Sequence, residues 1–447
     1  MNDVPEPRFL PRRRACLFTL GCRLNQYETE ALRDRLEARG YDVVPWGEPA
    51  DLAIVNSCTV TRLAEAKCRQ IVRGFVKANP RAFCAVVGCY PQTDAEALAA
   101  IPGVDLVVGN RDKLSVLDYV GDGEKLPVPL VVRGRLPSSD FSVPVVRGSP
   151  VTKRVNLKVQ DGCDFMCSYC IIPFARGRAR SRDFADLVAE AKNLAARGVR
   201  EITITGVNVG TYANGGNDIL DVIDAVSAVP GIARVRVGSI EPKTIPDGVF
   251  DRMSDPAHPL MPFLHLPLQS GCGRILRDMH RHYTLDEYLR FIREIDARVP
   301  DVCIGTDIMV GFPGETDEEF DETCRTFTEN PFAYAHVFTY SERAGTPAAR
   351  RTDRVPVPTR QRRSVALRGL SAAKHREFMR RFLGRDEEIL FENPQGDFWP
   401  GYTKNYLRVL VPAAEFPGEN LANTLRVVRL ESLAPSAEAL AGTRPRL

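Results

Sequence analysis

The stretch Cys163-Asp-Phe-Met-Cys167-Ser-Tyr-Cys170 follows a predicted strand, Val155–Val159, and carries three cysteines in a C-x3-C-x2-C pattern. Cysteine thiolates ligate the irons of a [4Fe–4S] cube individually, so one such loop can hold three corners of a cube. No fourth cysteine lies nearby in the sequence, and the nearest histidine is His258. The pattern therefore favours a cluster with one open iron. The alternative, a closed zinc site, would require a distant fourth ligand.

Alternating strand and helix patterns extend from this loop toward the C-terminus. Strands are predicted at Val155–Val159, Glu201–Thr205, Arg234–Val237, Phe263–Pro267, Cys303–Val310 and Ala335–Tyr340, with helical patterns between them. Six strand–helix units in ~190 residues predict a partial (β/α)6 barrel, because a closed eight-fold barrel typically needs ~250 residues. The cysteine loop follows the carboxyl end of the first strand, which is where α/β barrels hold their active sites.

A second strand–helix alternation precedes the loop, over residues 15–110. Its strands are predicted at Ala15–Leu20, Leu52–Asn56, Phe83–Val87 and Val104–Val108, and its helices at Tyr27–Arg39, Arg62–Ala78 and Thr93–Ala100. This alternation predicts an α/β domain with a doubly wound parallel sheet that is covered on both faces.

Three cysteines of this region share one position relative to their strands. Cys22, Cys58 and Cys89 each follow the end of a predicted strand. The carboxyl ends of parallel strands lie at one edge of a sheet, where ligands bind, so we expect the three thiols to converge. The alternative is three unrelated buried residues, since free cysteine is commonly found in cores. Cys16 and Cys84 fall inside strands and are predicted to pack there.

Length and composition limit the remaining possibilities. A chain of 447 residues is too long for one ordinary core, so we place domains at 13–122, 151–380 and 381–447, with a proline-rich linker at 123–150. The last domain has short β-branched runs between Gly and Pro, which predict a small all-β barrel. Neither a membrane span nor a signal peptide is predicted. The 12 cysteines are therefore expected in the reducing cytoplasm, where clustering indicates metal or redox chemistry.

The whole arrangement resembles the radical-SAM methylthiotransferase family. The Cys163–Cys170 loop is similar to the radical-SAM motif, in which S-adenosylmethionine (SAM) chelates the open iron. The segment Thr19-Leu-Gly-Cys22-Arg-Leu-Asn-Gln-Tyr-Glu-Thr29 resembles the MtaB-type branch of the family, and Gly401-Tyr-Thr-Lys-Asn-Tyr406 resembles its RNA-binding TRAM domain. The likeness covers nearly the whole chain.

The resemblance implies two [4Fe–4S] clusters, one on the Cys163–Cys170 loop and one on the three N-terminal cysteines. It implies that SAM is both radical source and methyl donor. The implied reaction adds a methylthio group to C2 of N6-threonylcarbamoyladenosine at position 37, in the anticodon loop of tRNA. A small reducing protein such as flavodoxin or ferredoxin is the expected electron donor, and both clusters are expected to face one cavity.

Three alternatives stay open at this point. Other members of the family act on isopentenyladenosine in tRNA or on an aspartate of a ribosomal protein. Outside enzymology, the chain could be a two-cluster electron carrier, but that function would favour fully ligated cubes.

Side chains at other strand ends of the barrel are candidates for the SAM pocket. The candidates are Asn208, Ser239, Glu241, Gln269, Asp307 and Val310. Asn208 stands where many radical-SAM enzymes have a Gly-Gly-Glu contact to the methionyl amine, and the strand around Asp307 resembles the adenine-contacting one. By contrast, His265 is predicted to be a packed core residue, and His280-Arg-His282 to lie on the surface.

Basic and aromatic residues offer two candidate contacts to RNA. Arginines cluster in three short segments, at 176–182, 350–351 and 360–363. Each cluster is more simply a solvated face, but together they are compatible with a polyanionic partner. The aromatic candidates in the last domain are Phe398, Trp399, Tyr402 and Tyr406. They can stack on bases or form the core of the barrel.

Overall fold

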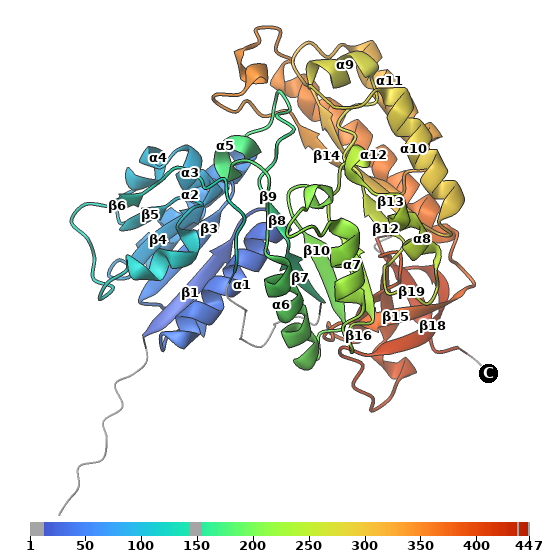
Figure 1. The fold of residues 1–447 in the computed structure, drawn as a ribbon, viewed down its shortest axis with the longest axis horizontal. Helices are drawn as coiled ribbons and strands as arrows, with labels where there is room; N and C mark the ends of the chain where they lie inside the picture. Colours follow the sequence, from blue (N-terminus) through green and yellow to red (C-terminus); the bar gives the residue numbers. More distant parts are fainter. Residues whose placement is uncertain (1–12, 144–153, 436–437, 446–447) are drawn as a thin grey trace, which may run out of the picture. The chain divides into compact units, whose positions relative to one another are not determined.

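The structure is a computed structural model that describes residues 13–143, 154–435 and 438–445 (Figure 1). These residues divide into two compact units. The N-terminal unit holds residues 13–137 and 174–177, and the C-terminal unit holds 138–143, 154–173 and the described residues from 178 onward. The short segment 174–177 belongs to the N-terminal unit although it follows the Cys163–Cys170 loop along the chain.

Six parallel strands form the sheet of the N-terminal unit, in the order β2-β1-β3-β4-β5-β6. The strands are β1 Arg14–Thr19, β2 Asp42–Val44, β3 Leu52–Ser57, β4 Phe83–Gly88, β5 Leu106–Val108 and β6 Leu130–Val132. The helical elements are α1 Arg23–Ala38, α2 Arg62–Ala78, α3 Cys89–Thr93, α4 Glu96–Ala99 and η1 Lys113–Asp118. Alternate side chains of β3 and β4 enter two separate hydrophobic cores, one on each face. The predicted doubly wound sheet is confirmed.

Some elements of this unit differ from the predictions. The sequence does not predict β2 or β6, because each has only three residues and both are partly exposed. Strand β6 pairs with β5 and lies inside the segment 123–150 that we predicted as a linker, of which residues 144–150 are outside the described part. Helix α1 begins at Arg23, four residues earlier than predicted.

The partial barrel of the C-terminal unit consists of two three-stranded parallel sheets, ordered β11-β10-β7 and β12-β13-β14. Single bridges, Val235 to Leu260 and Ser239 to His265, join the two sheets. The strands are β7 Arg154–Lys158, β10 Glu201–Thr205, β11 Arg234–Val237, β12 Phe263–His265, β13 Cys303–Val310 and β14 Tyr334–Thr339, and β8 Gln160–Asp161 pairs with β9 Arg180–Ser181. All six predicted strands are present, within one or two residues of the predicted bounds.

Helices cover one face of these strands. The helical elements are α5 Ile172–Arg176, α6 Phe184–Ala196, η2 Val209–Thr211, α7 Ile219–Ser227, η3 Pro242–Thr244, α8 Gly248–Ser254, α9 Gly273–Asp278, α10 Leu285–Arg298, α11 Asp317–Glu329, η4 Pro347–Arg350 and α12 Val357–Arg380. Ile304 and Ile308 of β13 pack in one hydrophobic core with Ile292 of α10 and Phe327 of α11. Side chains alternate along a strand, so Asp307 and Met309 point to the opposite, inner face. No helix among the described residues is both long and apolar enough to cross a membrane.

A closed five-stranded barrel ends the C-terminal unit, in the order β15-β16-β17-β19-β18. Its elements are β15 Asp386–Phe391, β16 Phe398–Tyr402, β17 Arg408–Pro412, η5 Ala413–Glu415, β18 Leu425–Leu433 and β19 Leu440–Thr443. The predicted all-β barrel is confirmed. Arg236 of β11 joins it to the partial barrel, because this buried guanidinium pairs with Glu201 at 2.8 Å and donates to the carbonyls of Thr403 and Lys404.

Candidate active site

The three N-terminal cysteines lie at the carboxyl edge of the N-terminal sheet. Cys22 caps the start of α1 after β1, Cys58 follows β3 directly, and Cys89 begins α3 after β4. Gly21 has a φ of +111°, and a Cβ there would lie 2.9 Å from that of Cys58, so this position requires glycine. Burial, together with smaller contributions from the nearby thiols of Cys89 and Cys22, raises the pKa of the Cys58 thiol to about 12. The three thiols thus share one edge of the sheet.

Two asparagines contact the sulfurs of this trio. Asn110 donates from Nδ2 to the sulfur of Cys89 over 3.4 Å and to the carbonyl of Ala175 over 2.5 Å. The thiol of Cys22 lies 3.7 Å from Oδ1 of Asn25. Hydrogen bonds to ligating sulfurs are one means by which proteins tune iron–sulfur clusters.

A buried ion-pair network stands behind these asparagines. Nη1 of Arg176 lies 3.1 Å from the Glu28 carboxylate, and Nζ of Lys113 lies 2.5 Å from it. Arg176 also donates to Oδ1 of Asn25 over 2.6 Å. Two cations against one anion leave positive charge close to Cys58, and Arg176 indeed acts to lower the pKa of that thiol against the effect of burial. The network therefore favours the thiolate that a cluster requires.

The Cys163–Cys170 loop brings its three thiols together in the C-terminal unit. Burial, with a smaller contribution from the neighbouring Cys167, raises the pKa of Cys163 to about 11 and that of Cys170 to about 12. The backbone N–H of Phe165 donates to the sulfur of Cys163 over 3.5 Å. Three neighbouring sulfurs on one loop fit three corners of a cube.

Arg281 is a neighbour of this loop that the sequence analysis placed on the surface. Its side chain is 3% exposed, whereas His280 and His282 are exposed as predicted. Nη1 of Arg281 donates to the sulfur of Cys167 over 3.4 Å, and Nη2 pairs with Glu241 at 2.6 Å. Burial raises the pKa of Glu241, and Arg281 opposes that rise. The candidate Glu241 is thus linked to the cysteine loop through Arg281.

Asn208 is a buried strand-end residue with one polar atom left without a partner. Its Oδ1 accepts from the Glu241 backbone N–H at 3.1 Å and from the Thr244 hydroxyl at 3.0 Å. Its Nδ2 has no hydrogen-bond partner among the described residues. Buried donors are almost always paired, so this N–H suits an acceptor on a bound ligand. A donor suits the carboxylate of SAM better than the methionyl amine that the sequence comparison indicated.

The remaining SAM candidates occupy different settings. The backbone of Ser239 bridges that of His265. Gln269 has a φ of +77°, and its main chain bonds to β13 through the Asp307 carbonyl at 2.7 Å. The Val310 side chain is fully buried in the hydrophobic core, so only its main chain can approach a ligand.

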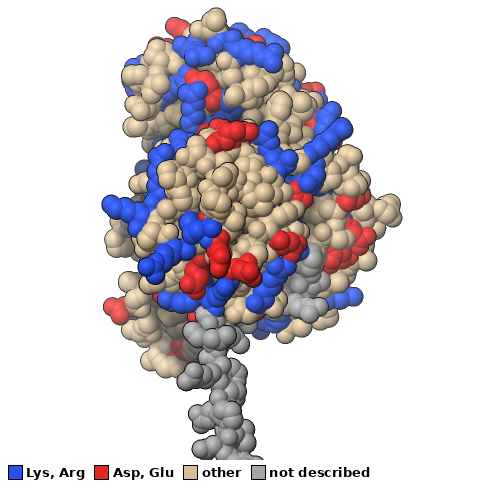
Figure 2. Space-filling view, turned by 90° about the vertical axis from the view of Figure 1, so that its left-hand side faces the viewer, with Lys and Arg blue, Asp and Glu red and all other residues tan. Residues whose placement is uncertain are grey.

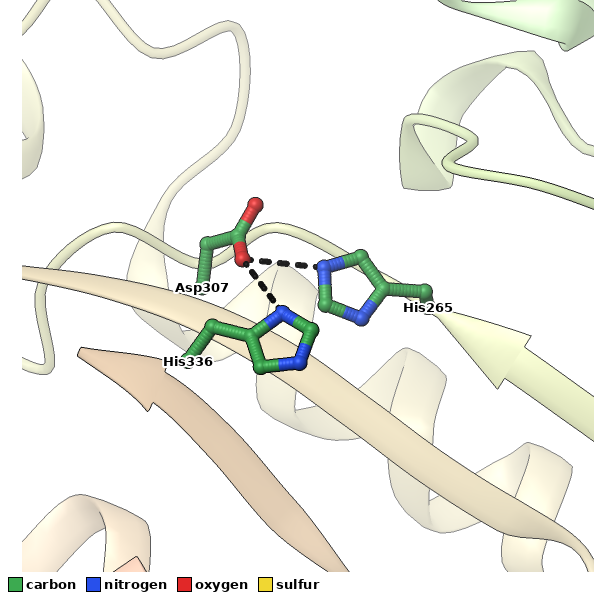
Figure 3. Close-up of side chains that lie close together, drawn as sticks. All are labelled: His265, Asp307 and His336. Carbon is green, nitrogen blue, oxygen red and sulfur yellow. Dashed lines mark ion pairs between the residues drawn. The ribbon is translucent and has the colours of Figure 1, made fainter. Parts of the chain in front are cut away.

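His265, Asp307 and His336 meet on the inner face of the second sheet (Figure 3). Oδ1 of Asp307 lies 3.0 Å from Nε2 of His265 and 3.5 Å from Nδ1 of His336. His265 is buried in a strand as predicted, but its partner is a carboxylate and not an apolar core. The sequence analysis missed His336, because only the register of β13 against β14 places it opposite Asp307.

The arginine clusters are used within the chain. Their ion pairs include Arg182 with Glu190, Arg351 with Asp353, Arg360 with Glu342 and Arg363 with Glu315. On the face drawn in Figure 2, basic and acidic side chains are interspersed. These clusters are therefore mainly structural.

The four aromatic candidates of the small barrel differ in burial. Trp399 packs in the core of the barrel. Tyr402 and Tyr406 stack at 4.9 Å beside Arg154, whose guanidinium lies 4.4 Å from the Tyr402 ring. Phe398, by contrast, is 44% exposed. Of the four aromatic candidates, Phe398 is the one with an exposed side chain.

Comparisons with known proteins agree with this arrangement. The model of the Radical SAM superfamily matches residues 157–327, and that of an uncharacterized protein family, UPF0004, matches residues 14–109. The threonylcarbamoyladenosine tRNA methylthiotransferase MtaB of Bacillus subtilis is 35% identical over 89% of this chain and 90% of its own length. The chain belongs to the radical-SAM methylthiotransferase family.

Two further proteins resemble this methylthiotransferase, one in sequence and one in fold. A tRNA-2-methylthio-N6-dimethylallyladenosine synthase of Geobacillus thermodenitrificans is also 35% identical, over 86% of this chain and 76% of its own length. The solved structure of the radical SAM methyltransferase TsrM from Kitasatospora setae superimposes with a TM-score of 0.53 at 16% identity, over 76% of this chain and 77% of that one, which shows a shared fold.

Family membership sets the class of chemistry. A radical-SAM methylthiotransferase is an enzyme that transfers sulfur-containing groups and uses [4Fe–4S] clusters with SAM. The two trios of neighbouring thiols and the unpaired donor of Asn208 fit these cofactors. The electron-carrier alternative is therefore set aside.

Proposed function

We propose that this methylthiotransferase acts in the cytoplasm on tRNA and adds a methylthio group to C2 of N6-threonylcarbamoyladenosine at position 37. The observation that carries the proposal is the presence, in one chain, of two separate trios of neighbouring thiols at the carboxyl ends of parallel strands. The MtaB relatives of Bacillus subtilis and Chlamydia pneumoniae are 35% and 34% identical to this chain. Both are named for threonylcarbamoyladenosine in tRNA.

The two trios divide the work. We infer that Cys163, Cys167 and Cys170 hold the cluster that binds SAM, and that the three N-terminal cysteines hold the second cluster. When bound, these cofactors supply the electron, the radical, the sulfur and the methyl group that the protein itself cannot provide, since an aryl C–H is not opened by acid–base catalysis.

The chain's own residues bind and orient. Arg281 donates to the sulfur of Cys167 and pairs with Glu241. These two contacts orient the Cys163–Cys170 loop. Asn208 offers its N–H to the carboxylate of SAM from a loop that its own Oδ1 holds in place. Cys89 and Cys167, one cysteine of each trio, are buried, which limits the access of water to reactive species there.

The small barrel is the proposed RNA contact. Phe398 is exposed on β16, and Arg426 is exposed on β18. Stacking on an aromatic ring with cations nearby is the usual way to bind single-stranded RNA. A small reducing protein such as flavodoxin or ferredoxin is the proposed electron donor.

Isopentenyladenosine is the second candidate substrate, because the Geobacillus relative is as similar to this chain as the MtaB relatives are. Mass spectrometry of tRNA nucleosides from cells that lack the gene tests the proposal. Loss of the 2-methylthio-threonylcarbamoyl nucleoside, restored by the wild-type gene, is the expected result. Loss of the isopentenyl analogue instead would contradict the assignment.

A further inference from the structure

The inner face of the second sheet carries a polar group in which Asp307, a candidate for the SAM pocket, meets two histidines that are not such candidates. Asp307 of β13 is the register partner of His336 of β14, and both histidines approach the same oxygen, Oδ1 (Figure 3). Among the described residues, neither Oδ2 of Asp307 nor Nε2 of His336 has a hydrogen-bond partner. The His336 side chain is 59% exposed. This group therefore presents a carboxylate oxygen and the ring nitrogen Nε2 to whatever occupies the inner face, and Nε2 donates when both ring nitrogens of His336 carry protons.

The surroundings hold this group in one arrangement. Tyr334 lies across Gly305, where a Cβ would come within 2.4 Å of the tyrosine oxygen, and its hydroxyl is 3.4 Å from Nδ1 of His265. The rings of His265 and His336 are 5.0 Å apart. Burial alone would raise the pKa of Asp307, but hydrogen bonds from His265 and His336 hold it well below its usual range. Asp307 is thus an ionised acceptor.

The chemistry of this face distinguishes the two candidate substrates. An isopentenyl group is a hydrocarbon, and placing it here would cover Oδ2 of Asp307 and Nε2 of His336 without giving either atom a partner, which is costly. A threonylcarbamoyl group brings N–H and hydroxyl donors together with a carboxylate. Sites built to hydrogen-bond a substrate reject analogues that lack those groups far more strongly than apolar pockets reject small differences in size.

We propose that His336 and Asp307 bind the threonylcarbamoyl group of the substrate, with the imidazolium form of His336 donating from Nε2 to its carboxylate and Asp307 accepting from its N–H or hydroxyl groups. His265 and Tyr334 act as positioning residues. The inference rests on the proposed function. It assigns the choice between the two candidate substrates to named residues, because the relatives named for the two substrates are equally identical to this chain.

The test measures binding and needs no turnover. Reconstituted full-length enzyme is titrated with synthetic anticodon stem–loops that carry threonylcarbamoyladenosine, isopentenyladenosine or plain adenosine. His336→Phe should reduce the preference for the threonylcarbamoyl RNA over the isopentenyl RNA at least tenfold. His336→Gln keeps a donor and should retain part of the preference. His258→Gln changes a histidine that pairs with Asp224 and is not part of this group, and it should leave all three affinities unchanged.

The outcomes separate the two proposals. If the wild-type enzyme shows no preference for the threonylcarbamoyl RNA, the proposed substrate is wrong. If the wild-type enzyme prefers it and His336→Phe does too, only the assignment of His336 is overturned. The three ligand atoms also lie within 4.8 Å of one another, as in a metal site. One equivalent of zinc or manganese in the wild-type enzyme that His336→Phe loses would overturn direct binding in favour of a metal.

Discussion

The guanidinium of Arg176 lies 3.1 Å from the carboxylate of Glu28, and both side chains are at most 2% exposed. Arg176 follows the last cysteine of the C-x3-C-x2-C loop by six positions, and Glu28 stands on the helix that Cys22 begins. Within the N-terminal unit, this ion pair therefore joins the segment 174–177 to α1. A run of arginines such as that at 176–182 usually forms a solvent-exposed face, but the Arg176 side chain is buried in this ion pair.

Replacing Arg176 with Met should destabilise the N-terminal unit by about 3 kcal/mol, because it breaks a buried, hydrogen-bonded pair. The same change removes the hydrogen bond from Arg176 to Oδ1 of Asn25, which contacts Cys22, so iron bound by the N-terminal trio should fall as well. Thermal unfolding and iron content after anaerobic reconstitution check both effects. Arg178→Met is the matched control, since that side chain is 62% exposed and its loss should cost less than ~0.5 kcal/mol. Equal losses of stability and iron in the two variants would show that the buried ion pair of Arg176 contributes no more than the exposed Arg178 side chain.

Cys89→Ala should lower the iron content of the reconstituted enzyme from about eight to about four per chain, since each cube holds four irons. Cys68→Ala is the control in the same unit, because Cys68 is equally buried but lies within α2, in the apolar core. It should keep both clusters at a modest cost in stability. Equal iron loss in the two variants would show that instability, and not ligation, causes the effect.

Glu201→Gln should destabilise the C-terminal unit by about 3–5 kcal/mol at neutral pH, because it leaves the fully buried Arg236 without its carboxylate. Burial alone would raise the pKa of Glu201, but Arg236 lowers it below the usual value of 4.5. A carboxylate with a depressed pKa stabilises the fold above its unfolded pKa and loses that effect as the pH falls. The melting temperatures of wild type and variant should therefore converge as the pH drops below about 4.5. A difference that is constant with pH would contradict this assignment.

The sequence predicts those features that depend on position along one strand. Runs of apolar residues gave the strands of both sheets, and the strand ends placed Cys22, Cys58 and Cys89 at one edge. Pairings between distant segments could not be predicted, because they depend on register and burial. His336 meets Asp307 only through the β13–β14 register, and Arg281 is buried although both neighbouring histidines are exposed. Local composition resembles a surface in both cases.

Asn208 tests whether an unpaired buried donor marks the SAM site. Its Oδ1 supports the loop through Glu241 and Thr244, whereas its Nδ2 has no partner among the described residues. Asn208→Asp keeps an acceptor for the loop but replaces the donor with a second oxygen, which would face the SAM carboxylate. We expect this variant to raise the dissociation constant of SAM at least tenfold, or about 1.4 kcal/mol, because a hydrogen bond to a charged group is lost and like charges meet.

Equilibrium dialysis with labelled SAM under anaerobic conditions measures the constant directly. Asn193→Asp on α6 is the control, since its side chain contacts only Arg197 at 3.3 Å among the hydrogen bonds described, and it should leave the affinity unchanged. Wild-type affinity in Asn208→Asp, with both clusters present, would mean that the unpaired N–H does not face SAM. The donor would then belong to a water-filled cavity, and the carboxylate of SAM would have to be bound from another strand end.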